Sequence, residues 1–150
     1  MKFFIYSIIS LVVVIGIVLI AFSVTSRKQP ELGLHKEQLL PCSSAKNCVC
    51  SEYRDQSAYI EPLLYTTTTE QAWEKLKRVI TETGGSVITK EAGYLRLAYE
   101  TPLLRYIDDV EFRLDNTTQH IHVRSASRVG QSDMGANRKR VEKIKARFNN

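Results

Sequence analysis

Several residue types are scarce in this 150-residue sequence, and each shortage excludes a class of protein. Four Pro and seven Gly are too few for a collagen-like or low-complexity chain. Three Cys are too few for a small scaffold held together by many disulfides. Hydrophobic residues make up 43% of the chain and aromatic residues 9%, so it is not mostly disordered either. Charged residues are absent from Phe3 to Ser26, and the rest of the chain is long enough for one modest domain but not for two.

The uncharged segment contains an apolar run of 20 residues, from Phe3 to Phe22. A membrane-spanning helix needs roughly 20 such residues, whereas the apolar core of a cleavable signal peptide has only about 7–15. Ala21-Phe22-Ser23 resembles a cleavage site, so removal of the segment is the alternative. We expect an uncleaved transmembrane anchor over residues 1–26, a tether over 27–39 and a single soluble domain over 40–150.

Basic residues flank the apolar run on both sides, with Lys2 before it and Arg27 and Lys28 after it. The positive-inside rule therefore gives almost a tie between the two orientations. Because an anchor with so short a leader normally exports the domain after it, we expect a single-pass protein of the cell inner membrane. Its soluble domain is then expected to be periplasmic, or more generally extracytoplasmic.

Positive charge is concentrated at the C-terminal end of the chain. Residues 124–150 carry eight basic side chains against two acidic ones, whereas residues 27–123 carry twelve basic and fourteen acidic ones. A solvated helix face explains this excess most simply; an anion site or a contact with an anionic membrane surface is the alternative. The chain has no zinc-finger or helix-turn-helix spacing, and we expect no nucleic-acid partner.

Hydrophobic periodicity predicts an α+β fold, with one small antiparallel β-sheet and two packed helices. Thr68 and Gln71 resemble a capping box, which predicts a helix over 70–83 that ends at Gly84-Gly85. Alternating patterns predict strands over 86–89, 94–100, 110–114 and 119–123, and a 3.6-residue period predicts a second helix over 137–148. The apolar loop 103–107 is expected to cover one end of the core, with membrane contact as the alternative.

The strands 110–114 and 119–123 are predicted to form a hairpin that turns at residues 115–118. This register places Phe112 opposite Ile121 and Val110 opposite Val123 on the core side. On the other face it pairs Glu111 with His122, Arg113 with His120 and Asp109 with Arg124. We expect these to be exposed cross-strand ion pairs, with a general acid–base role for Glu111 and His122 as the alternative.

Two stretches of sequence carry a resemblance to a known family. The first is PCSSAKNCVCS, residues 41–51, and the second combines DDVEF, residues 108–112, with RSASRVGQSDMGANRKR, residues 124–140. Together they resemble the domain of unknown function 1499 (DUF1499) family of bacterial and plastid proteins, over about residues 40–148. The family has no established activity, so the resemblance implies no reaction, substrate or catalytic residue.

The resemblance bears on the cysteines. Cys42 and Cys48 match the family pattern, whereas Cys50 stands where the family has a small hydroxyl residue, and Ala45-Lys46 replaces Ser-Pro. The spacing of the three cysteines fits neither a zinc site nor a thiol redox motif, and we expect no metal and no cofactor. In an oxidising compartment the resemblance implies a Cys42–Cys48 disulfide, and reduced buried thiols are the alternative.

The arginine- and serine-rich stretch is the candidate site, because guanidinium groups, hydroxyls and the free amides of a helix start all bind anions. The candidate ligand-binding residues are Arg124, Ser125, Ser127, Arg128, Ser132, Asn137 and Arg138. The acidic residues that would pair with these arginines instead are Asp108, Asp109 and Asp133. A helical wheel turns Arg138 towards the domain and Lys139 towards solvent, so we expect one of these carboxylates to pair with Arg138.

The function expected from these features is binding without catalysis. The membrane-anchored domain would hold an anionic small molecule, a lipid or an envelope polymer. An envelope hydrolase or transferase that uses the same stretch, and a purely structural envelope component, are the alternatives. Against catalysis, His120 and His122 lie on the opposite strand face from Ser125 and Ser127, so neither serine has an evident base.

Overall fold

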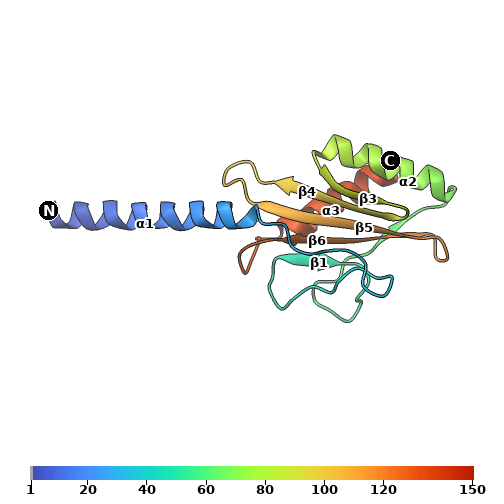
Figure 1. Ribbon diagram of the computed structural model, residues 1–150, viewed down its shortest axis with the longest axis horizontal. Coiled ribbons are helices and arrows are strands. Elements are labelled where there is room, and N and C mark those ends of the chain that lie inside the picture. Colours follow the sequence, from blue (N-terminus) through green and yellow to red (C-terminus); the bar gives the residue numbers. More distant parts are fainter. Residues whose placement is uncertain (1) are drawn as a thin grey trace.

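The computed structural model describes residues 2–150 and has two parts (Figure 1). Helix α1, Lys2–Ser26, projects from one end, and its only buried residue is Ser26. It is long and apolar enough to cross a membrane. The rest of the chain forms a six-stranded antiparallel sheet with two helices, which confirms the predicted α+β fold.

The sheet has the strand order β1-β6-β5-β4-β3, and the short strand β2 also pairs with β6. Its strands are β1 (Cys48–Cys50), β2 (Leu63–Leu64), β3 (Ser86–Glu91), β4 (Tyr94–Glu100), β5 (Ile107–Asp115) and β6 (His120–Ser127). Strands β5 and β6 are longer than predicted, since β6 extends through the first residues of the arginine- and serine-rich stretch. Strand β1 was not predicted.

The two helices that pack on the sheet begin and end near the predicted positions. Helix α2, Thr69–Thr83, has the capping box between Thr68 and Gln71 and ends at Gly84, whose φ of 85° is left-handed. Helix α3, Ala136–Asn149, follows a loop after β6. Both helices bury an apolar stripe on the same face of the sheet (Figure 1).

The opposite face of the sheet is covered as well. Residues from the segment between α1 and β2 lie against it, and Leu39, which is fully buried, packs with Cys50 and Tyr94 there. The Leu39 backbone N–H donates to Glu52, whose carboxylate also accepts from Arg113 at 2.6 Å. Beside this small apolar cluster, the covered face of the sheet carries buried charged side chains.

The predicted register of the β5–β6 hairpin is wrong by two positions. Phe112 pairs with Val123, Glu111 with Arg124 and Arg113 with His122. The loop comprises residues 116–119, one position later than predicted, and ends at Gln119 with a φ of 55°. A shift of two positions keeps every side chain on its predicted face but changes its partner.

Two further expectations differ from the structure. The Glu111 side chain is fully buried, so the polar face is not a set of exposed ion pairs. Leu103 is 89% exposed, so the loop between β4 and β5 does not cover the core.

Candidate functional site

The structure divides the predicted site residues into three groups, because β6 alternates and the chain then turns away from it. Ser125 and Ser127 face α3, whereas Arg124 and Arg128 lie on the covered face of the sheet. Ser132, Asp133 and Arg138 lie around the start of α3.

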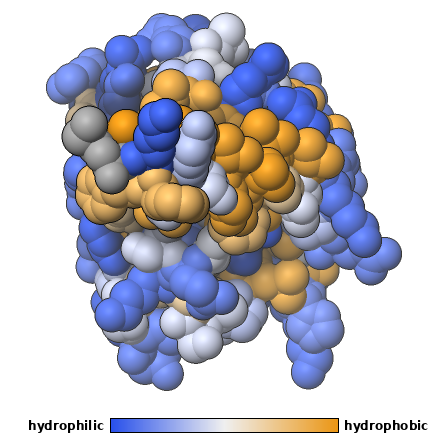
Figure 2. Space-filling view, turned by 90° about the vertical axis from the view of Figure 1, so that its left-hand side faces the viewer, coloured by the Kyte–Doolittle hydropathy of each residue, from blue (hydrophilic) through white to orange (hydrophobic). Residues whose placement is uncertain are grey.

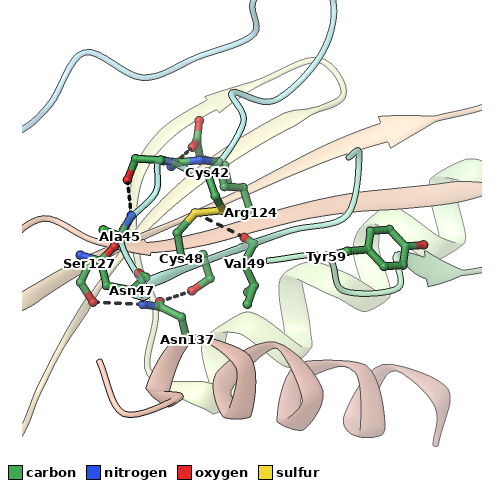
Figure 3. Close-up of a disulfide and its surroundings, with 12 residues drawn as sticks. Cys42, Ala45, Asn47, Cys48, Val49, Tyr59, Arg124, Ser127 and Asn137 are labelled. Carbon is green, nitrogen blue, oxygen red and sulfur yellow. Dashed lines mark hydrogen bonds and ion pairs between the residues drawn. A yellow bond between two sulfur atoms is a disulfide. The ribbon is translucent and has the colours of Figure 1, made fainter. Parts of the chain in front are cut away.

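Asn137 is the centre of the first group and fixes α3 to the sheet. Its side-chain amide donates to the Asn47 carbonyl at 2.9 Å and to the Ser127 hydroxyl at 3.0 Å (Figure 3). Its side-chain oxygen accepts from Ser125 and from Arg140. Asn137 and Ser125 are fully buried. These hydroxyls and this amide are therefore occupied inside the protein.

The partial positive charge at the start of α3 is already neutralised by a carboxylate of the protein itself. Asp133 accepts from the backbone N–H groups of Gly135 and Asn137, at 2.9 and 2.7 Å. Arg138 donates to the Tyr59 carbonyl at 2.9 Å, and not to an aspartate as expected. Asp108 pairs with Arg140, which was not among the predicted residues. An external anion would have to displace Asp133 from these amides.

Asp109 joins two arginines on the covered face. Arg96 donates to Asp109 Oδ1 through Nε and Nη2, at 3.0 and 2.9 Å. Arg128 makes a bidentate pair with the same carboxylate, at 2.7 and 2.9 Å. The Asp109 side chain is only 2% exposed, so both pairs are shielded from water. Losing one member of such a network leaves a buried charge without its partner.

Arg128 also connects the sheet to α1. Its Nη1 donates to the carbonyl of Ser26, the last residue of α1, at 3.1 Å. A cation at the C-terminal end of a helix interacts favourably with the helix dipole and with carbonyls that lack helical partners. The Ser26 hydroxyl accepts from the Ile107 backbone N–H at 3.3 Å. The end of α1 is therefore bonded to both β5 and the end of β6.

Arg124 has fewer hydrogen-bond partners than Arg128. Its Nη1 donates to Glu111 at 3.0 Å, and Glu111 also accepts from the Tyr94 hydroxyl at 2.7 Å. Its Nε is buried and has no hydrogen-bond partner among residues 2–150. Burial, and then the charge of Glu111, raises the pKa of Tyr94. Glu111 therefore accepts from a neutral phenol, and its charge is shared between Tyr94 and Arg124.

A cavity of about 390 Å³ lies between the end of α1 and the covered face of β5 and β6. We call it the junction cavity. It is lined by Thr25, Lys28, Gln29, Pro30, Leu32, Asp109, Arg124, Ala126, Ser127 and Arg128. Three of these side chains are basic and one is acidic, so the walls carry an excess of positive charge. Three predicted site residues, Arg124, Ser127 and Arg128, line it, although the Ser127 hydroxyl points towards α3 and accepts from Asn137.

Ser51 and His122 are the one pair among the described residues that resembles a nucleophile with a base. The Ser51 hydroxyl lies 3.2 Å from His122 Nδ1, and its oxygen accepts from the Val123 backbone N–H at 2.8 Å. Burial, with Arg113 next in importance, lowers the pKa of His122 to about 4, so the imidazole is neutral at pH 7. However, Ser51 is only 3% exposed, and a substrate could not reach its hydroxyl. The contact therefore fixes β6 to the residues after β1.

The cysteines are arranged as the resemblance implies. Cys42 and Cys48 form a disulfide, with Cα atoms 5.7 Å apart, beside Arg124 (Figure 3). Cys50 is free and buried, and burial raises its pKa to about 11, so it is an unreactive thiol. Residues 2–150 contain no group of three or more His, Cys, Asp or Glu side chains placed to hold a metal ion.

The sequence did not predict several residues that contact the site arginines or their neighbours on the covered face. The alternation of β4 does contain a signal for Arg96, since Leu95 and Leu97 on the core side place Arg96 on the face of Glu111. Glu52 and Ser26 give no such signal, because each reaches its partner only through the tertiary structure.

Comparison with known proteins identifies the family of the whole domain but not its activity. A search of curated proteins finds no match to the chain. A family model described as "Protein of unknown function (DUF1499)" matches residues 38–148, which include the disulfide, the whole sheet, α2 and all but the last residue of α3. This chain therefore belongs to the DUF1499 family.

Proposed function

We propose that this protein is a single-pass membrane protein whose domain binds an anionic group in the junction cavity without chemically changing it. The observation that supports this most directly is the buried Nε of Arg124, which has no partner among residues 2–150 and lies on a side chain that lines the cavity. An unpaired buried donor costs about 1–3 kcal/mol. A small shift of the Arg124 side chain towards the cavity would let a bound oxyanion accept from this donor and remove that cost.

The surrounding charges favour the same ligand chemistry. Lys28, Arg124 and Arg128 line the cavity, and Asp109 is the only carboxylate among its lining residues. Both oxygens of Asp109 already accept from arginines, so they offer little repulsion to an incoming anion. Lys28 is exposed and free to move towards a ligand. A phosphate group, from a lipid headgroup or from a soluble molecule, has the charge and the acceptor oxygens that this arrangement needs.

The location forms part of the proposal. Helix α1 would anchor the chain in the inner membrane with the domain on the extracytoplasmic side, and the Cys42–Cys48 disulfide suits such an oxidising compartment. Thr25, in the last turn of α1, lines the junction cavity. The cavity would then open at the membrane–water boundary.

Charge removal at Lys28 tests the site without breaking a buried ion pair. The full chain in neutral detergent is titrated with inorganic phosphate, and separately with phosphatidylglycerol against phosphatidylcholine, while its melting temperature is measured. The wild type should be stabilised by one of the two anionic probes, and the effect should weaken with salt. Lys28→Gln should bind that probe more weakly, and its melting temperature without the probe should equal that of the wild type. The matched control is Arg27→Gln, at the exposed neighbouring residue, which should bind the probe as the wild type does.

A second pair of variants separates binding from folding. Arg124→Gln removes the orphaned Nε, and Arg113→Gln disrupts a comparable buried pair, with Glu52, outside the cavity. Both variants should lose stability, by roughly 3–5 kcal/mol if the buried pair is fully broken. Only Arg124→Gln should lose the response to the probe. If neither probe stabilises the wild type, the arginines are structural and the proposal is wrong.

A further inference from the structure

The loop between β4 and β5, residues 101–106, lies along the side of α1. The Tyr106 hydroxyl is 3.5 Å from the carbonyl oxygen of Leu19, and the next residue, Ile107, donates its backbone N–H to Ser26. These two contacts are seven residues apart on the helix, which corresponds to about 10 Å at 1.5 Å per residue. The Tyr106 side chain at the end of the loop therefore reaches along the last two turns of α1.

The contact at Leu19 lies within the apolar run of α1. This run ends at Phe22, so Leu19 lies about 4–5 Å inside the run, on the N-terminal side of its end. If α1 spans a bilayer with its apolar run in the hydrocarbon, a side chain that touches Leu19 lies at the depth of the membrane surface. Tyrosine is one of the two residues enriched at that depth.

The tip of the loop is apolar, and hydrogen bonds close its base. Leu103 is 89% exposed. Figure 2, in which the N-terminal end of α1 faces the viewer, shows apolar side chains in front of a largely hydrophilic periphery. Thr101 and Tyr106 close the loop through a backbone hydrogen bond of 2.9 Å and a second one from the Tyr106 N–H to the Thr101 hydroxyl. Arg105 has a left-handed φ of 56° and pairs with Glu100 at 2.6 Å.

We infer that this loop is a second membrane contact, which inserts Leu103 into the surface of the bilayer that α1 spans. The lipid surface is the partner because the loop contacts the apolar run of α1 through Tyr106 and has the residue types of an interface: an exposed leucine flanked by a tyrosine and an arginine. The inference rests on the membrane span in the proposed function but not on the junction cavity. With α1, the loop holds the domain down against the membrane and fixes the side that faces the lipid.

Quenching of tryptophan fluorescence by brominated lipids tests this contact. Trp73 is the only tryptophan, so Leu103→Trp is made in a Trp73→Phe chain and the full protein is reconstituted in vesicles whose lipids carry bromine near the headgroup. The matched control is Leu64→Trp, since Leu64 is also exposed, at 58%, but pairs with His120 at the opposite end of β6 from Arg128. Phe22→Trp reports on α1 itself. Should Trp73→Phe fail to fold, Trp73 is kept and its emission subtracted.

Leu103→Trp and Phe22→Trp are expected to lose most of their emission, and Leu64→Trp is expected to keep it. Quenching of Phe22→Trp with emission from Leu103→Trp equal to the control would overturn the second contact and leave the membrane span intact. If Phe22→Trp is not quenched, both the span and the contact are wrong. A blue-shifted but unquenched Leu103→Trp would mean that a protein surface, such as a second copy, covers the loop, and this too would overturn the inference.

Discussion

Arg124 and Arg128 are four residues apart and on the same face of the sheet, yet the protein uses their donors differently. Every nitrogen of the Arg128 guanidinium donates to Asp109 or to the end of α1. Arg124 has one partner, Glu111, and a buried Nε without a partner among the described residues. At the scale of single residues, Arg128 is therefore fully paired within the protein, whereas Arg124 keeps the unpaired donor on which the proposed anion site depends.

Asn137 is predicted to be a large contributor to stability, although it was first selected as a ligand-binding residue. Asn137→Ala removes an amide whose two ends make four hydrogen bonds inside the protein and leaves the buried Ser125 hydroxyl without its acceptor. We expect a loss of about 2–3 kcal/mol in the free energy of unfolding, measured by chemical denaturation.

The two neighbouring positions provide the controls for Asn137. Arg138 makes one hydrogen bond, to Tyr59, so Arg138→Ala should cost about 1 kcal/mol or less. Lys139 is exposed, and Lys139→Ala should change the stability by less than about 0.5 kcal/mol. An Asn137→Ala protein as stable as the Lys139→Ala protein would show that this network does not hold α3 to the sheet.

At the scale of elements, β6 connects β1, β2, β5 and α3. Its core side binds α3 through Ser125 and Ser127, and its other side carries Arg124. Strand β1 pairs with it along Cys48–Cys50. The disulfide fixes the segment before β1 to this strand and so helps to keep the charged face covered.

Thiol counting tests the disulfide directly. Under denaturing, non-reducing conditions one thiol per chain, that of Cys50, should react, and three should react after reduction. Replacing both partners, Cys42→Ser with Cys48→Ser, should lower the free energy of unfolding by roughly 2 kcal/mol, because the closed loop is short. Reductant should destabilise the wild type by a similar amount and leave this double variant unchanged. Three reactive thiols in the untreated protein would contradict the assignment.

At the scale of the whole molecule, α1 is bonded to the domain. Ser26 is fully buried between the end of α1 and β5, and Arg128 donates to its carbonyl. A cleaved signal peptide would have no such contacts with the mature protein. The segment 27–39 after α1 is also more than a flexible tether, since Leu39 is buried against the sheet.

We therefore predict that α1 is retained in the mature protein and that the domain is exported. The intact mass of protein purified from membranes should include residues 2–26. A phosphatase fused after Asn150 should be active and a fluorescent protein that folds only in the cytoplasm should be dark. A mature chain that starts near Val24, or a reporter active only in the cytoplasm, would contradict this prediction.

The sequence by itself determined the features that depend on neighbouring residues. The helix after Thr68 begins and ends as predicted because its capping box and Gly84 act within one turn. The apolar run of α1 and the alternation of β5 and β6 likewise arise from local periodicity. The resemblance to DUF1499 also implied the Cys42–Cys48 pair that the structure contains.

Only the tertiary structure decided the partners. A loop one residue later than predicted moved Arg124 from Asp109 to Glu111 without changing its face, because side chains alternate with a period of two. Burial of the charged face depends on Leu39 and its neighbours, and the docking of α1 depends on Arg128, which is about a hundred residues away in the chain. Such contacts arise when the whole chain folds, and no local pattern encodes them. The junction cavity exists for the same reason: its walls come from segments that meet only in the folded protein.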